Sequence, residues 1–234
     1  MRQLDSSVRY FLVQKLRISN KRAIELIISG KVLINNIPAT ILQKIQPEDS
    51  ITVEGKEVRS GKKFIYWKYY KPRGIETTLN SNIPNNLHTV LSLPADVFPV
   101  GRLDKESEGL LILSDDGRIF NKTLMSKEHE KEYLVQVDQP LLDTQIARLA
   151  SGIVIMGYKT RSCAVNKISS HSFRIVLTEG KNRQIRRMCH KLNLKVTRLI
   201  RTRIMNITTE GLFTGLQTTM SEQEKTELFR QLGI

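Results

Sequence analysis

Cysteine is scarce in this chain, which contains only Cys163 and Cys189. Two cysteines provide no disulfide framework, and we expect both to be reduced in a cytoplasmic protein. Cys189 is followed by His190, but no further ligands stand at the spacing of a structural zinc site. The sequence therefore predicts no metal site.

Long apolar runs are also absent. The longest, such as Gly109–Leu113, have the length of a strand, whereas a bilayer-spanning helix needs about 20 apolar residues. The first residues, Met1–Asp5, contain no apolar stretch of the kind found in secretory signals. We therefore expect no membrane association. Nothing in the sequence indicates an oligomer or a protein partner, so a monomer is expected.

Acidic residues are outnumbered by basic ones, 23 to 37, which gives a formal net charge of +14. The excess is concentrated between His171 and Met205, where ten basic residues accompany the single acid Glu179. Residues 1–60 hold a milder excess of ten basic over six acidic residues. A basic run is often only a solvated face, but two separate basic regions favour binding of a polyanion such as nucleic acid.

The first 60 residues are predicted to form a small module of two helices and short strands. Apolar residues recur at helical spacing from Val8 to Leu16, and Ser19 is a suitable N-cap for a second helix. That helix is expected to bury Ala23, Ile24, Ile27 and Ile28 and to end at Gly30. Strands are predicted at 32–34 and 50–53, with a turn at Asn35-Asn36 and a linker at 56–63.

The remaining residues are predicted to form one larger domain, 61–234, that is mostly antiparallel sheet with few helices, α+β in class. Strands are expected at 64–70, 110–113, 131–137, 153–155, 163–168 and 173–177. Helices are expected near 88–91, 118–124, 141–150 and 183–192, and residues 221–232 are helix-prone. A long polar loop at 77–94 is of a length often associated with function.

One carboxylate stands out in this domain. Asp104 lies in the Gly-bounded segment Gly101–Gly109, between an apolar approach at 97–100 and the apolar strand 110–113. On residue type alone, Asp104 could simply cap a turn, as Asp commonly does. Paired carboxylates also perform acid–base hydrolysis, and Glu106 and Asp115 are the nearest candidates for a pair with Asp104.

Four motifs occur in order along this domain: Lys71-Pro-Arg-Gly, the block Gly101–Leu111 with Gly-Arg-Leu-Asp, Lys131-Glu-Tyr-Leu-Val, and Leu177-Thr-Glu-Gly-Lys-Asn-Arg-Gln-Ile-Arg-Arg-Met. The set resembles the RsuA-type pseudouridine synthases. The N-terminal module, with Gly-Lys-Val-Leu-Ile-Asn after its second helix, resembles the S4 RNA-binding domain that accompanies this type. The two resemblances together cover nearly the whole chain.

The family resemblance implies an enzyme that converts a uridine in RNA, ribosomal RNA in particular, to pseudouridine without a metal or organic cofactor. By motif match, Asp104 is the catalytic carboxylate, and it could attack the ribose, add to the base or remove a ribose proton. Tyr133 matches the tyrosine that stacks on the flipped-out base. Arg186 matches the cation that pairs with the carboxylate, and Leu177 an apolar residue beneath the tyrosine or the base.

The resemblance also implies a set of RNA-contacting residues. Arg102 is expected to fill the stack that the flipped nucleotide leaves, because a guanidinium is both planar and charged. The others are expected to face phosphates: Arg17, Lys21, Arg22 and Lys31 in the N-terminal module, and Lys181, Arg183, Arg187, Lys191 and Lys195 in the larger domain.

Several alternatives remain at this point. The main substrate could be a tRNA uridine, or the chain could be a non-catalytic RNA-binding factor in ribosome assembly. The presence of Asp104, Tyr133 and Arg186 together argues against loss of catalysis. A hydrolase is disfavoured because Glu106 lies in a polar, solvent-facing run, and a membrane-surface protein because no amphipathic helix has an aromatic apolar face.

Overall fold

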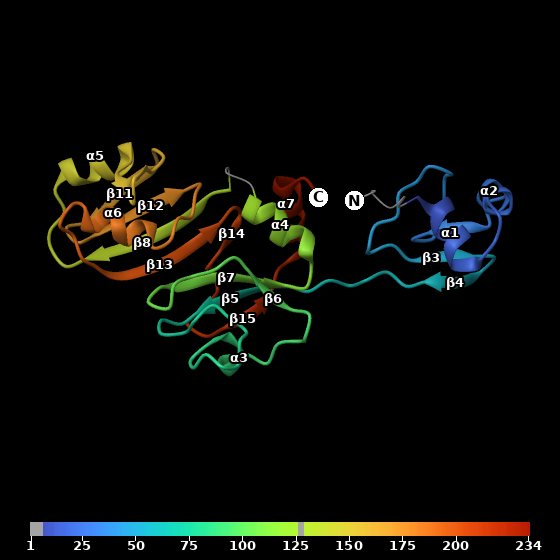
Figure 1. The fold of residues 1–234 in the computed structure, drawn as a ribbon, viewed down its shortest axis with the longest axis horizontal. Coiled ribbons are helices and arrows are strands. Elements are labelled where there is room, and N and C mark those ends of the chain that lie inside the picture. The colour runs from blue at the N-terminus through green and yellow to red at the C-terminus, as the bar shows by residue number, and fades with distance from the viewer. Residues whose placement is uncertain (1–6, 126–128) are drawn as a thin grey trace. The chain divides into compact units, whose positions relative to one another are not determined.

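A computed structural model describes residues 7–125 and 129–234 of the chain. The chain divides into two compact units, residues 1–64 and 65–234. Figure 1 shows both units as ribbons.

The first unit contains two helices and one small sheet. Helices α1 (Val8–Leu16) and α2 (Asn20–Ile28) precede an antiparallel sheet of order β2-β1-β3-β4. The strands are β1 (Val32–Ile34), β2 (Ile37–Pro38), β3 (Ile51–Val53) and β4 (Lys56–Arg59). One face of each helix packs with β1 and β3 around a common apolar core.

The sequence predictions for this unit are largely confirmed. The Ser19 hydroxyl caps α2 by accepting a hydrogen bond from the Arg22 amide at 3.2 Å. Asn35 and Asn36 turn the chain with φ of 50° and 66°. Two details were wrong: Leu26 is buried in α2 and Ile28 is 70% exposed, and the predicted linker begins as β4. Lys56–Arg59 pairs with β3 although its side chains are polar. A strand at the edge of a sheet makes backbone hydrogen bonds on one side, and its side chains can remain in solvent.

The second unit is built on a nine-stranded sheet. Its main order is β11-β12-β8-β13-β7-β5-β15, with β14 beside β13 and β6 beside β7. The strands are β5 (Tyr66–Lys71), β6 (Phe98–Val100), β7 (Glu108–Ser114), β8 (Lys131–Val137), β11 (Ala164–Ser169), β12 (Ser172–Leu177), β13 (Val196–Ile204), β14 (Ile207–Thr208) and β15 (Gln217–Thr219). Among the described strands only β13 and β7 run parallel, so the expected α+β class is confirmed.

In the described residues of this unit, five helices and one further hairpin accompany the sheet. The helices are α3 (Leu87–Val90), α4 (Gly117–Met125), α5 (Asp143–Ser151), α6 (Gln184–His190) and α7 (Glu222–Leu232), and the hairpin pairs β9 (Val154–Ile155) with β10 (Tyr158–Lys159). Helices α5 and α6 lie at the β11–β12–β8 end of the sheet (Figure 1). Helices α4 and α7 contact each other, and α4 also contacts β6. Side chains from α5, α6, β8 and β12 form the largest part of one apolar core.

The sequence predictions missed strand β13, although it lies in the middle of the sheet. Three arginines, Arg198, Arg201 and Arg203, gave residues 196–204 the character of a basic surface segment. The structure uses these charges internally: Arg198 pairs with Glu108 at 2.6 Å and Arg203 with Glu130 at 2.9 Å. Fewer positive charges between His171 and Met205 are therefore available to bind a polyanion than the residue count indicates.

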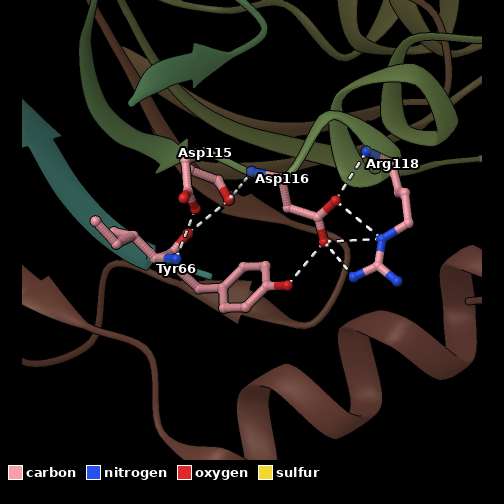
Figure 2. Close-up of polar contacts among 6 residues, drawn as sticks. Tyr66, Asp115, Asp116 and Arg118 are labelled. Atoms are coloured by element: carbon pink, nitrogen blue, oxygen red, sulfur yellow. Dashed lines mark hydrogen bonds and ion pairs between the residues drawn. The ribbon is translucent and has the colours of Figure 1, made fainter. Parts of the chain in front are cut away.

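A polar network joins the start of β5, the end of β7 and the start of α4 (Figure 2). Asp116 is 1% exposed and accepts hydrogen bonds from the Tyr66 hydroxyl at 2.7 Å and from the Arg118 guanidinium and amide. Burial opposes ionisation of Asp116, but the bonds from Arg118 and Tyr66 lower its pKa below the ordinary value. Asp115 accepts the Ile65 amide at 2.7 Å. This use of Asp115 as a backbone anchor argues against the hydrolase alternative.

Candidate active site

The segment that carries Asp104 connects β6 to β7 and is held as a tight turn. The Ser107 amide donates to the Asp104 carbonyl at 3.0 Å, and the Asp104 side chain is half-buried. The strands on both sides are paired with each other, with Val100 opposite Ile112. A short excursion between two paired strands leaves the turn little freedom to move.

Thr77 fixes the residue immediately before Asp104. Its buried hydroxyl donates to the Leu103 carbonyl at 2.7 Å and accepts from the Leu103 amide at 3.1 Å. Thr77, the first residue of the long polar loop 77–94, thus anchors the turn directly. The Gly74 amide, from the Lys71-Pro-Arg-Gly motif, donates to the Lys105 carbonyl at 2.8 Å on the other side of Asp104.

Two arginines hold the same turn through its carbonyl oxygens. Arg201, in β13, donates to the carbonyls of Arg102 at 3.2 Å and Leu110 at 2.8 Å. Arg186, in α6, donates to the carbonyls of Glu106 at 2.9 Å and Val196 at 3.2 Å. Every backbone position from 102 to 106 thus makes at least one of these hydrogen bonds, and the turn is fixed before any substrate arrives.

Arg186 is therefore beside the Asp104 turn, but it engages the backbone. Within residues 7–125 and 129–234, no ion pair within 4.0 Å joins Asp104 to a basic side chain. Burial, followed by repulsion from Arg183, lowers the pKa of Arg186, while the Asp104 carboxylate opposes that shift. Asp104 is thus an electrostatic neighbour of Arg186, and direct pairing of the two stays a prediction.

Asp104 opens into a cavity of about 480 Å³, which we call the Asp104 pocket. Tyr133, Leu177 and Arg102 line the same pocket, so three of the residues singled out by motif lie around the carboxylate. They come from β8, the end of β12 and the turn itself. Glu76, Lys181, Asn182 and Arg183 form part of its polar wall.

The sheet register explains why Tyr133 faces this pocket. In β8 Tyr133 lies opposite Arg201 of β13 on one side and Ile175 of β12 on the other. Burial lowers the pKa of the Arg201 guanidinium, and the Tyr133 side chain opposes that shift. Leu177 is 3% exposed, so it forms both core and pocket wall.

Lys71 is a buried cation beneath the site that the sequence predictions did not single out. Its side chain is 0% exposed, and Nζ donates to the carbonyls of Ile75 at 2.7 Å and Pro72 at 2.8 Å. Burial first, and then the Arg201 guanidinium, lowers its pKa to about 8 from 10.5, while Asp104 is among the carboxylates that oppose the shift. Lys71 thus shapes the Lys71–Ile75 segment from which Gly74 reaches the turn.

The predicted phosphate-facing residues of the second unit surround α6. Lys181, Arg183, Lys191 and Lys195 are exposed, and Lys181 Nζ lies 4.8 Å from the centre of the Tyr158 ring. Arg187 is half-buried and donates to the Asn182 carbonyl at 3.0 Å. In the first unit Arg17, Lys21, Arg22 and Lys31 are exposed, but Lys31 pairs with Glu54 at 2.8 Å and Arg22 with Glu25 at 3.4 Å.

Three positioning residues were missed from the sequence: Lys71, Thr77 and Arg201. A signal existed for Lys71, because it opens one of the four motifs. Arg201 opens the segment 201–206 and Thr77 begins the polar loop 77–94, but neither pattern indicates the contact that each makes, because the partners lie 26 to 99 residues away in the chain.

Metal-ligating side chains do not gather in the site. Throughout the described ranges, no three His, Cys, Asp or Glu residues are placed to hold a metal ion. The helices of the same ranges include none long and apolar enough to cross a membrane.

Comparisons with known proteins give the family and the fold. Residues 65–191 match the family model of RNA pseudouridylate synthase. A solved structure described as a pseudouridylate synthase superposes with a TM-score of 0.67 at 25% identity, covering 95% of this chain and 99% of the other. The chain belongs to the RNA pseudouridine synthases, the enzymes that isomerise uridine to pseudouridine in RNA.

Within this family the chain is of the RsuA type. It is 38% identical over 231 residues to the dual-specificity RNA pseudouridine synthase RluF of Shigella flexneri, covering 97% of this chain and 80% of that protein. The RluF of Escherichia coli strain K12 is 37% identical over the same length. Ribosomal large subunit pseudouridine synthase B of Bacillus subtilis is 31% identical, with 84% of each chain covered. Segments 129–133, 182–189 and 201–206 predict similarity to large-subunit synthase F, and these relatives confirm it.

Proposed function

We propose that Asp104 is the catalytic carboxylate and that the Asp104 pocket receives the target uridine. The observation that carries the proposal is the fixed turn: four neighbours, Thr77, Gly74, Arg186 and Arg201, bind its backbone around a carboxylate that has no ion-pair partner of its own in the described ranges. A carboxylate held this way is free to act on a substrate with little reorganisation.

The reaction in which Asp104 would act is an isomerisation, so the product contains the same atoms as the substrate. The N1–C1′ bond of uridine breaks, the uracil turns within the pocket, and C1′ bonds to C5. C5 then loses its hydrogen and N1 gains one, so nothing is consumed. Tyr133 stacks on the base while it is detached, Leu177 supports it from the apolar wall, and Arg186 and Arg201 keep the turn in place.

The remaining predicted residues would bind the RNA around the flipped nucleotide. Arg102 is exposed at the mouth of the pocket, where it is suited to replace the uridine in the stack. Lys181, Arg183, Arg187, Lys191 and Lys195 would contact phosphates near α6. Residues 1–60, with Arg17, Lys21, Arg22 and Lys31, would act as an S4-like RNA-binding module ahead of a catalytic domain at 61–234.

We infer that the substrate is a uridine in 23S ribosomal RNA, with a tRNA uridine as the second candidate. One relative is named a large-subunit synthase and others are named dual-specificity enzymes, which supports both classes. The basic surfaces recognise the backbone of either RNA equally.

The test is pseudouridine mapping of large-subunit rRNA and tRNA after incubation with the protein or with Asp104→Asn. We expect new modified positions with the wild type and none with the variant. Asp96→Asn, an exposed carboxylate changed in the same way, is the matched control and should retain activity. Equal modification by Asp104→Asn would overturn the assignment, and new positions in tRNA alone would overturn the rRNA assignment.

A further inference from the structure

A second, larger cavity adjoins the Asp104 pocket. It has a volume of about 970 Å³, and we call it the Phe120 pocket. The two cavities share Arg102, Tyr133, Glu179, Gly180 and Lys181 as a common wall. This volume is near the upper end of the ~300–1,000 Å³ range of small-molecule sites. A single uracil bound in the Asp104 pocket does not account for it.

One side of the Phe120 pocket is apolar and aromatic. Phe98 of β6 and Phe120 of α4 lie edge to face, with ring centres 5.6 Å apart and planes at 90°. Pro99, Val100 and Ile204 extend this side. Such a wall suits the face of a neutral heteroaromatic ring, because base–aromatic stacking is sequence-tolerant and contributes substantially to binding. It does not suit a phosphate, which would lose its hydration against it.

The other side of the pocket offers hydrogen-bond donors from one buried and one half-buried side chain. Arg201 is 3% exposed, and its Nη2 has no hydrogen-bond partner among the residues that the structure describes. Lys131 also lines the pocket, and burial followed by repulsion from Arg201 lowers its pKa. Its Nζ donates to the His129 carbonyl at 3.3 Å, and an ammonium group has further hydrogens to donate. A buried donor without a partner is costly, and a ligand that brings an acceptor would remove that cost.

The acidic residue of the common wall is already occupied. Glu179 accepts hydrogen bonds from the Gln184 side chain at 2.8 Å, the Tyr158 hydroxyl at 2.9 Å and the Arg161 amide at 3.1 Å. The charged side chains that line the pocket and are not already paired are thus donors, and the ligand must present acceptors.

We propose that the Phe120 pocket binds a second unpaired nucleobase of the RNA, close in sequence to the target uridine. The base would stack on one of the two perpendicular rings, Phe98 or Phe120, place its edge against the other, and accept hydrogen bonds from Arg201 and Lys131. The inference rests on the proposed function for the identity of the ligand as part of an RNA substrate. The base whose edge best fits two donors is guanine, which presents O6 and N7 side by side. The enzyme would then select RNA in which two nearby bases can leave the stack together.

Fluorine NMR of the full chain, labelled with 4-fluorophenylalanine, tests the site without any catalytic step. The Phe98 and Phe120 signals are assigned with Phe98→Leu and Phe120→Leu, and the probes are guanosine 5′-monophosphate and ribose 5-phosphate. We expect saturable shifts of both signals with the nucleotide and not with the sugar phosphate. Equal shifts with ribose 5-phosphate, or no saturable shift with the nucleotide, would overturn the proposal.

Charge-to-apolar variants add a control for the donors. Lys131→Met should weaken nucleotide binding about tenfold, because it removes a charged donor, while Lys63→Met, an exposed lysine, should leave it unchanged. Equal weakening by both variants would contradict a donor role inside the pocket. A protein that shifts these signals but forms no pseudouridine contradicts only the proposed function, and one that forms pseudouridine without the shifts contradicts only this site.

Discussion

At the scale of single residues, the turn of Asp104 depends on donors that come from distant parts of the chain. Arg186 satisfies two backbone carbonyls, those of Glu106 and Val196. A planar, forked donor can serve two acceptors in different directions, which lysine cannot do with the same geometry. The role of Arg186 in the structure is thus positional, in addition to any direct effect on the charge of Asp104.

Replacing Arg186 should therefore affect catalysis more than RNA binding. We expect Arg186→Met to slow pseudouridine formation about 10²-fold, the effect of a small misplacement of the reacting group, with RNA affinity nearly unchanged. Single-turnover kinetics and a separate binding titration measure the two effects. Arg186→Lys should recover only part of the rate. A variant that loses affinity and keeps its rate when saturated with RNA would show that Arg186 acts as a phosphate contact.

Lys71 leads to a prediction about pH. Its pKa is lowered to about 8 in the folded protein from 10.5, so the unfolded chain binds a proton between these two values while the folded chain does not. The free energy of unfolding contributed by Lys71 therefore rises as the pH is raised from about 8 toward 10.5. Below about pH 8 the buried lysine is charged and its full destabilising effect is present.

The comparison that isolates Lys71 is the wild type against Lys71→Met. Urea unfolding at several pH values should show the wild type gaining stability relative to the variant by up to about 1.4 kcal/mol per pH unit in this window. Groups common to both proteins cancel in the difference. A difference that stays constant across the window would contradict the lowered pKa.

At the scale of elements, the junction of β7 and β13 requires a glycine. Gly109 lies opposite Arg201 in the parallel pair, with φ of +104°. A Cβ at this position would lie 2.4 Å from the Arg201 carbonyl oxygen. The close approach of the two strands brings the Arg201 guanidinium to the carbonyls on either side of the Asp104 turn.

Gly109→Ala should therefore destabilise the protein by about 3 kcal/mol or more, through backbone strain and overpacking combined. Gly117→Ala, at the start of α4, is the matched control, because its Cβ would have no neighbour within 4 Å. Thermal or denaturant unfolding of the two variants measures the difference. Equal stability of both would mean that the β7–β13 junction relaxes without cost.

At the scale of the whole molecule, net charge is a poor guide to the RNA-binding surface. Many of the basic residues are used internally, as Arg198, Arg201 and Arg203 are in β13. In the first unit Lys31 and Arg22 have glutamate partners, whereas Arg17 and Lys21 have no ion pair within the described residues. The residues without partners should contribute more to RNA affinity, because no existing interaction has to be broken.

The double variant Arg17→Gln, Lys21→Gln should weaken RNA binding and reduce its salt dependence. Each lost phosphate contact should lower the slope of log affinity against log salt by about 0.7–0.9. The double variant Arg22→Gln, Lys31→Gln serves as the comparison and should have the smaller effect. Affinity titrations at several salt concentrations measure the slope for each double variant. An equal change in slope for both would contradict the idea that the ion pairs with Glu25 and Glu54 reduce the contribution of Arg22 and Lys31 to RNA binding.

The sequence by itself determined the elements that depend on local pattern and the site residues that lie in motifs. Ser19 caps α2 through a contact three residues away, and the alternation in 131–137 marks β8, so both were predictable. The ordered motifs indicated the family and pointed to Asp104, Tyr133 and Leu177, which the structure gathers around one pocket.

Only the tertiary structure decided what holds that carboxylate in place. Strand β13 enters between β8 and β7, and this long-range pairing turns Arg201 from an apparent surface charge into a buried anchor. Thr77 reaches Leu103 across 26 residues. Contacts of this kind follow from strand order and register, which no local spacing of residues encodes.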